Sequence, residues 1–188
     1  MARPGETLEN PAMRARLVFR ETAETTGGEL VSFDFFLEPK GIIAEEHIHP
    51  RQEERMQVLQ GTLHGRISGE PSEARAGEEY TMTPGTRHAW WNGGDEEVHL
   101  IVEFRPALQA ETLFETVFGL AGDGKTREGG VPNLLQLAVL LRAYPGEFYP
   151  ARLPRMIRPL IVSVLAPIAT LFGYRARYPK YSSDGGQH

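Results

Sequence analysis

Hydrophobic and polar residues alternate regularly between Glu29 and Leu37, with apolar side chains at Val31, Phe33, Phe35 and Leu37. Successive side chains of a strand point to opposite faces, so this run predicts a half-buried strand. Further short strands, separated by Gly, Pro, Asn and Asp, are predicted at 14–20, 55–60, 62–68, 79–82, 88–91 and 97–104. Many short strands with frequent turns indicate a sandwich or a barrel, and a barrel leaves a mouth where a ligand can bind.

The hydrophobic period changes to a helical one after Pro106. Helices are predicted over 107–120, from an Asn133 cap to Ala143, and over about 153–172. The last helix contains sixteen residues without a charge, 159–174, which is fewer than the ~20 that a membrane-spanning helix needs. We therefore expect it to lie against the barrel, against a neighbouring subunit or on a membrane surface.

The chain has 188 residues and is 40% hydrophobic, which is enough for one domain with an elaboration. We predict a β-barrel over 1–106, a helical C-terminal extension over 107–181 and a disordered tail over 182–188. Cysteine is absent, so any metal must be bound by nitrogen and oxygen ligands. The N-terminus lacks the apolar stretch of a secretory signal, and a cytoplasmic location is the expectation.

Charge is distributed unevenly along the chain. Residues 1–106 contain 11 Lys/Arg and 19 Asp/Glu, whereas residues 107–188 contain 9 and 6. A nucleic-acid partner is not expected, because the chain as a whole is acidic, with a net charge of −5. The basic residues of the C-terminal part could be solvated helix ends or could contact an anionic partner such as a membrane surface through 150–181: Arg152, Arg155, Arg158, Arg175, Arg177 and Lys180.

A candidate metal site comes from three histidines and one glutamate. His47 and His49 share one face of a strand, because they are two positions apart. In the next strand the apolar face contains Glu54 and not Glu53, which makes Glu54 the expected fourth ligand. His88 is the expected third imidazole. Four candidate ligands in phase with an apolar face predict a site for one divalent ion, with Fe, Mn, Ni and Zn all compatible with these ligand types.

Two stretches resemble the motifs of the cupin superfamily. The first, from Gly41 to Gly61, fits the pattern Gly-x5-His-x-His-x4-Glu-x6-Gly at every fixed position. The second, from Gly77 to Asn92, fits Gly-x5-Pro-x-Gly-x2-His-x3-Asn except that Thr83 stands where the first Pro is usual. The resemblance covers about residues 28–106. It implies a mainly β fold, the double-stranded β-helix or jelly-roll barrel, here followed by an α-helical extension that resembles those of some uncharacterised bacterial cupins.

The resemblance does not fix the function, because cupins include dioxygenases, decarboxylases, isomerases, regulators and storage proteins. The first hypothesis is a metal-dependent oxygenase acting on a small hydrophobic or aromatic, oxygen-bearing substrate. Met56, Val58 and Trp90 are the residues expected to line its substrate pocket. The second hypothesis is a non-catalytic sensor or binding protein for a small-molecule ligand. An interaction protein that uses the barrel only as a scaffold is a third, which the complete set of four ligands disfavours.

A homodimer is the expected assembly, since small cupins related by this resemblance are commonly dimers. Trp91 faces outward by parity, and the uncharged stretch 159–174 supplies more apolar surface than one barrel can cover. The C-terminal helices are expected to cover the interface or to pack across the partner. Peripheral contact with a membrane surface through 150–181 is the alternative.

Overall fold

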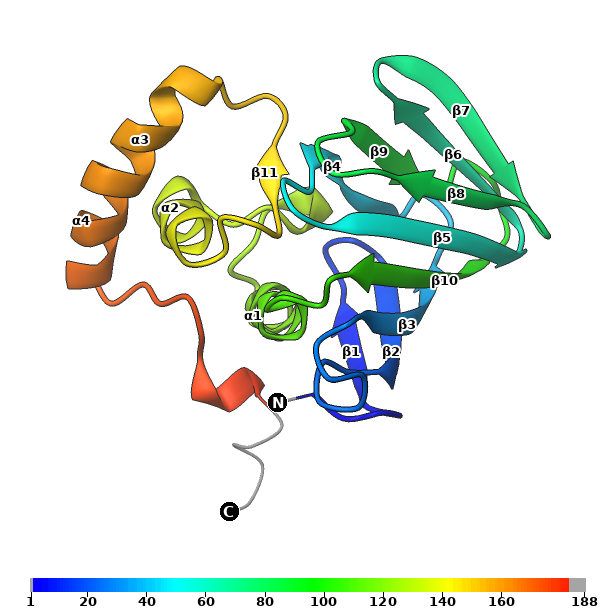
Figure 1. Ribbon diagram of the computed structural model, residues 1–188, viewed down its shortest axis with the longest axis horizontal. Helices are drawn as coiled ribbons and strands as arrows, with labels where there is room; N and C mark the ends of the chain where they lie inside the picture. The colour runs from blue at the N-terminus through cyan, green and yellow to red at the C-terminus, as the bar shows by residue number, and fades with distance from the viewer. Residues whose placement is uncertain (1, 183–188) are drawn as a thin grey trace.

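A computed structural model describes residues 2–182 and places two antiparallel sheets beside a group of helices (Figure 1). The first sheet has the strand order β1 (Thr7–Asn10), β2 (Ala15–Glu21), β3 (Val31–Leu37), β10 (Val98–Arg105), β5 (Glu53–Gln60), β8 (Glu79–Met82). The second has the order β11 (Tyr149–Pro150), β4 (Ile42–Ile48), β9 (His88–Trp91), β6 (Thr62–Ile67), β7 (Glu70–Arg75). The mainly β barrel with C-terminal helices is therefore confirmed.

Alternating burial explains why the predicted strands formed. In β10, every second residue from Val98 to Phe104 is buried, and the residues between them are partly exposed. Val102 pairs with Phe33 of β3 and with Met56 of β5, so the apolar faces of three strands meet in one core. Two strands that the alternation did not predict, β1 and β7, contain one buried residue each, Asn10 and Ala74, and have no alternating apolar face. Such strands form through pairing with their neighbours.

Two of the predicted helices are present at nearly the expected positions. Helix α1 (Ala110–Gly122) packs on the barrel, and Phe114 contacts the rings of Phe33 and Phe104. Helix α2 (Leu134–Ala143) begins at the predicted cap, where the Asn133 side chain accepts a hydrogen bond from the Gln136 backbone N–H at 3.0 Å.

The third predicted helix is not one continuous α-helix. It consists of a 3-10 turn (η2, Arg155–Ile157), α3 (Arg158–Leu160), a π-helical segment (η3, Ile161–Leu165) and α4 (Ala166–Leu171). Pro159 and Pro167 each lack a backbone N–H, and a proline ring clashes with the carbonyl one turn earlier. The proline positions thus give a physical reason for the changes of helix type. Within the described residues, no helix is both long and apolar enough to cross a membrane.

The described residues form two hydrophobic cores. The first fills the barrel and includes Ala107, Ala110 and Phe118 at the start of the extension. The second joins α2 to the segment 161–169 and to Tyr149 of β11. Trp91 is half-buried and pairs in register with His64 on β6. Of the predicted disordered tail 182–188, Ser182 is buried, and 183–188 lie outside the described residues.

Candidate metal centre and its cavity

The four predicted ligands meet at one point inside the barrel. His47 lies in β4, His49 directly follows that strand, Glu54 lies in β5 and His88 in β9. All four are buried, and each is at most 8% exposed. Glu54, the glutamate that strand parity favoured, points inward and joins the cluster, whereas Glu53 does not. One ligand atom from each of the four lies within 4.8 Å of the others.

The facing atoms of the cluster are close together. Nε2 of His47 lies 3.0 Å from Nε2 of His49. Oε2 of Glu54 lies 2.8 Å from Nε2 of His88 and 3.3 Å from Nε2 of His49. These distances bring three imidazole nitrogens and one carboxylate oxygen around a common point.

Each imidazole is oriented by a backbone carbonyl at its other nitrogen. Nδ1 of His47 lies 2.8 Å from the Glu45 carbonyl, Nδ1 of His88 lies 2.9 Å from the Thr86 carbonyl, and Nδ1 of His49 lies 2.5 Å from the Glu147 carbonyl. A carbonyl only accepts hydrogen bonds, so each Nδ1 carries the proton and donates. In the neutral ring each Nε2 therefore carries a lone pair, which is the tautomer that a metal ligand requires.

Lone pairs that face each other in a buried site need a positive charge between them. Glu54 Oε2 and His88 Nε2 are buried without a hydrogen-bond partner, even though they lie 2.8 Å apart. Two acceptors at this distance repel each other unless a proton or a metal cation intervenes. The orphaned atoms and the three-nitrogen, one-oxygen donor set therefore fit a divalent ion, and the cluster could bind one.

The electrostatic environment favours the ligand form of two residues. Burial lowers the pKa of His47 well below its ordinary value, and the nearby His49 and His88 lower it further, so His47 is neutral at physiological pH. Burial opposes ionisation of Glu54, but His49 and His88 outweigh it and hold the pKa of Glu54 below its usual range. Burial also opposes protonation of His88, but Glu54 outweighs it and raises the pKa of His88.

A cavity of about 220 Å³ opens from the cluster toward the helices. Its polar end contains His47, His49 and Glu54. The rest of its wall is almost wholly apolar and comes from β4, β10, α1, the loop before α2, α2 itself and the segment that follows it. The main residues of this wall are Ile43, Phe104, Leu113, Phe114, Val117, Val131, Leu137, Leu140, Tyr144 and Phe148. The helical extension thus closes the cavity that the barrel begins.

The segment 147–150 connects the extension directly to the ligands. The Glu147 carbonyl accepts from His49, and the Phe148 ring centroid lies 5.2 Å from that of His47. Strand β11 pairs with β4, so that Pro150 lies opposite His47, and Figure 1 shows β11 between the helices and the barrel. The Glu147 carboxylate accepts hydrogen bonds from the backbone N–H groups of Gln109 and Gly146, which fixes the turn. Nothing in the local sequence pattern indicated these contacts.

The residues expected to line the substrate pocket lie elsewhere. Met56, Val58 and Trp90 are each 1% exposed and belong to the core of the barrel. Trp90 covers Gly65, where an added Cβ would lie 2.2 Å from the indole ring. None of the three lines the cavity beside the cluster, so this cavity gives no support to a pocket role for them. Strand parity identified which side chains point into the barrel, but it does not tell whether they line an open cavity or pack in the core.

Known protein families and structures are similar to the β part of the chain. A protein-family profile described as "Cupin domain" matches residues 33–104, which include all four residues of the cluster. A curated relative, "Polyketide synthase CurC" from Streptomyces cyaneus, is 34% identical over 68 residues, 36% of this chain. The alignment covers 44% of that relative, so the chain matches less than half of the relative's length.

Several solved structures have a similar barrel. A cupin-superfamily sugar phosphate isomerase from Silicibacter pomeroyi superposes with a TM-score of 0.48 at 18% identity, covering 53% of this chain and 70% of that one. An RmlC-like cupin from Shewanella frigidimarina gives 0.48 at 18%, covering 55% and 86%. The polyketide cyclase RemF from Streptomyces resistomycificus gives 0.45 at 19%, covering 56% and 70%.

Proposed function

Residues 33–104 form a cupin domain, and from this premise we propose that the chain is a metal-dependent enzyme, an oxygenase of small hydrophobic, oxygen-bearing compounds. The observation that carries the proposal is the position of the His/Glu cluster at the polar end of an otherwise apolar cavity. A bound Fe or Mn ion would supply Lewis acidity or a redox centre there.

The residues that line the cavity determine which kind of molecule can bind there. The polar groups of the cavity outside the cluster are largely engaged. The Tyr144 hydroxyl donates to the Ala176 carbonyl, the Gln52 amide donates to the Pro106 and Ala107 carbonyls, and Glu46 pairs with Arg87. A sugar phosphate would need cationic groups, and no Lys or Arg lines the described cavity wall. The shape and polarity favour a flat or aliphatic molecule with one enolate, catechol or carboxylate group directed at the cluster.

The side chains of the cavity wall would act by binding and orienting the substrate. Phe114 and Phe148 offer aromatic faces to a flat substrate, while the surrounding Leu and Val side chains exclude water from the polar end. Burial raises the pKa of Tyr144 to about 12, so its hydroxyl stays protonated and continues to donate to Ala176. It is therefore a fixed wall group and a poor general base.

A ligand-binding protein without catalysis is the second candidate. The polar side chains of the cavity wall already have hydrogen-bond or ion-pair partners, so few groups outside the cluster could act as a general acid or base. This observation favours the second candidate. The name of the curated relative adds polyketide-type compounds with several carbonyl groups to the molecules that either candidate should be tested against.

The test is to incubate the Fe- or Mn-loaded protein with flavonols, catechols, β-dicarbonyls and polyketide-type compounds, with and without oxygen. Oxygen uptake that depends on substrate and disappears in Glu54→Ala supports the oxygenase. Tight binding without turnover under every metal supports the sensor instead.

A cavity-filling variant separates the pocket from the metal. Val117→Trp occupies the cavity wall and should abolish turnover or binding while the metal content is retained. Val164→Trp, at a position 44% exposed on the outer side of the extension, is the matched control and should keep the wild-type turnover, small-molecule binding and metal content.

A further inference from the structure

An uncovered apolar stripe follows the outer side of the segment 155–172. Its large side chains occur every four residues, at Met156, Leu160, Val164, Ile168 and Phe172. Met156 is 92% exposed and Phe172 is 74% exposed, and the adjacent Leu171 is 87% exposed. Monomeric proteins rarely leave contiguous apolar surface of this kind without a partner.

The segment that carries the stripe passes through several helix types. In an ideal α-helix, residues spaced by four drift around the axis, because a turn holds 3.6 residues. The π-helical segment η3 has more residues per turn, so a spacing of four drifts in the opposite direction there. Meanwhile Ile161, Ala166 and Ala169 are buried against α2, so the inner face is already used.

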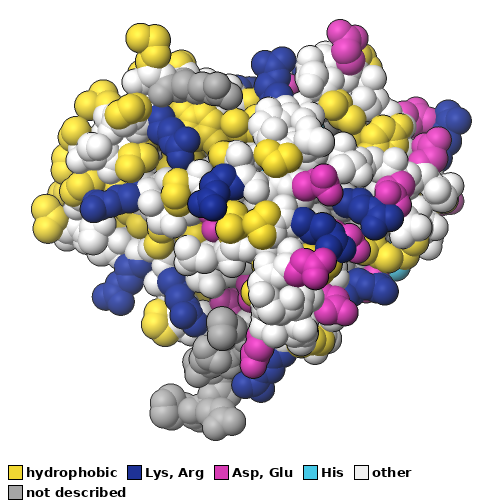
Figure 2. Space-filling view, viewed as in Figure 1, with side chains coloured by type: hydrophobic (Ala, Val, Ile, Leu, Met, Phe, Trp, Pro, Cys, Tyr) yellow, Lys and Arg dark blue, Asp and Glu magenta, His cyan; other side chains and the backbone are white. Residues whose placement is uncertain are grey.

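The residues on either side of the stripe carry only positive charge. The sequence contains no Asp or Glu between Glu147 and Asp184, whereas Arg152, Arg158 and Arg175 fall within this stretch. Arg152 and Arg175 are exposed. Figure 2 shows hydrophobic side chains over the edge where Figure 1 places α3 and α4, with Lys and Arg among them, while Asp and Glu gather over the barrel side. An apolar stripe bordered by cations is complementary to an anionic, partly apolar partner.

A second copy of the chain fits this surface poorly. A two-fold symmetric interface places the same patch on both subunits. The arginines of one stripe would then approach those of the other, with no acidic residue from 148–183 to pair with them. Charge repulsion opposes a dimer in which one stripe packs on the other, whereas the expected homodimer, with C-terminal helices that cover the interface or pack across the partner, stays a prediction.

We propose that the stripe 156–172 docks on an anionic lipid bilayer. The apolar side chains enter the boundary between headgroups and acyl chains, and the arginines contact the lipid phosphates. The segment lies along the surface, in agreement with its short length. This proposal concerns a surface distinct from the cavity and does not rest on the oxygenase function.

The test is co-sedimentation of the purified full-length protein with phosphatidylcholine vesicles and with vesicles in which about one third of the lipid is phosphatidylserine. We expect binding to the anionic vesicles that weakens at high salt, and little binding to the neutral ones. The double variant Leu171→Ser/Phe172→Ser should weaken binding by roughly tenfold or more, since each side chain loses its apolar contact with the bilayer. Arg152→Glu/Arg175→Glu should weaken binding to anionic vesicles only.

The matched control is Leu59→Ser, which removes a 42% exposed leucine on β5 of the barrel and should bind vesicles as wild type does. Circular dichroism and metal content verify that each variant is folded. Failure to sediment with anionic vesicles overturns the proposal. So does a dimer in light scattering that dissociates in Leu171→Ser/Phe172→Ser, because the stripe would then be covered by a second copy.

Discussion

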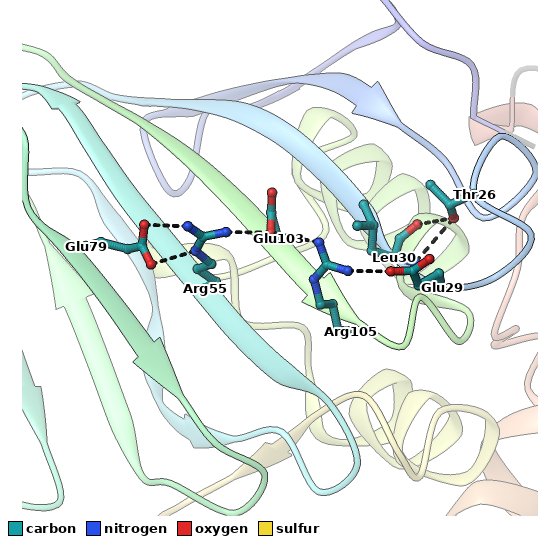
Figure 3. Close-up of polar contacts among 7 residues, drawn as sticks. All are labelled: Thr26, Glu29, Leu30, Arg55, Glu79, Glu103 and Arg105. Atoms are coloured by element: carbon teal, nitrogen blue, oxygen red, sulfur yellow. Dashed lines mark hydrogen bonds and ion pairs between the residues drawn. The ribbon is translucent and has the colours of Figure 1, made fainter.

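The two faces of strand β5 place neighbouring residues in opposite environments. Glu54 points inward, is 2% exposed and lies among three imidazoles. Arg55 points outward and belongs to what we call the charge row, Glu79–Arg55–Glu103–Arg105–Glu29, which crosses β8, β5 and β10 (Figure 3). Both faces of β5 therefore carry charged side chains. Those of the inner face are buried, whereas those of the outer face stay in contact with water.

The difference lies in how each charge is compensated. In the charge row every charge has an opposite partner and contact with solvent: Arg55 contacts Glu79 through two hydrogen bonds, at 2.7 and 2.6 Å. In the buried cluster the ligand atoms are acceptors facing acceptors. Exposed ion pairs contribute little to stability, whereas an uncompensated buried charge is costly. A proton on His88 or a bound cation compensates the cluster, and the comparison predicts large effects of substitutions inside the barrel and small effects of substitutions outside it.

The largest expected effect is on metal content. Glu54→Ala removes the only carboxylate of the cluster, and His47→Ala or His88→Ala removes one of three imidazoles. We expect each variant to lose stoichiometric metal, as measured by elemental analysis of protein purified without added metal. Arg55→Ala, one residue away on the outer face, is the matched control and should retain it. Full occupancy in Glu54→Ala would show that the cluster is not the site.

A smaller loss of metal affinity is expected when the contact between the helical extension and His49 is weakened. Glu147→Ala removes the carboxylate that accepts from Gln109 and Gly146, so the carbonyl that orients His49 is held less firmly. We expect the Kd of the ion to rise about ten- to a hundredfold, as for other residues that orient a ligand. Metal titration measures it.

Glu147→Gln keeps an acceptor oxygen and should lose less affinity than Glu147→Ala. Glu73→Ala, on the outer strand β7, should leave the Kd unchanged. Equal affinities in all three variants would mean that the barrel alone orients His49.

The dependence of metal affinity on pH is the next effect in size. Glu54 raises the pKa of His88 above its ordinary value of 6.5 in spite of burial, so His88 holds a proton below that raised pKa. An incoming ion must displace this proton. Affinity should therefore fall by about tenfold for each unit of pH below the raised pKa.

Titrations at about pH 8 and about pH 6 measure this change. Glu79→Ala, which removes a carboxyl of the charge row whose pKa is lowered by Arg55, should show the same pH dependence as wild type. An affinity that is constant over this range contradicts the protonation of His88 in the metal-free site.

The smallest effect is expected from breaking the charge row. Arg105→Ala removes the contacts with Glu29 at 2.8 Å and with Glu103 at 3.4 Å, all between solvent-exposed or partly exposed side chains. We expect Tm to change by at most about 2 °C and metal content to stay at the wild-type level. A large drop in Tm, measured by calorimetry, would mean that the outer face contributes more than its exposure indicates.

The sequence by itself determined the barrel and the identity of the cluster. Strand alternation is a local property with a period of two, so it placed His47 beside His49 and chose Glu54 over Glu53 without knowledge of the rest of the fold. The Asn133 cap and the extent of α2 followed from equally local signals.

Only the tertiary structure decided what surrounds the cluster. The contact between His49 and Glu147 joins residues 98 positions apart, and β11 is a two-residue strand without a pattern of its own. Met56, Val58 and Trp90 have the inward parity of the ligands, yet the barrel core encloses them, while the cavity wall comes from α1, α2 and Phe148. Periodicity fixes the direction of a side chain, whereas an open cavity depends on which distant segments pack against that side chain.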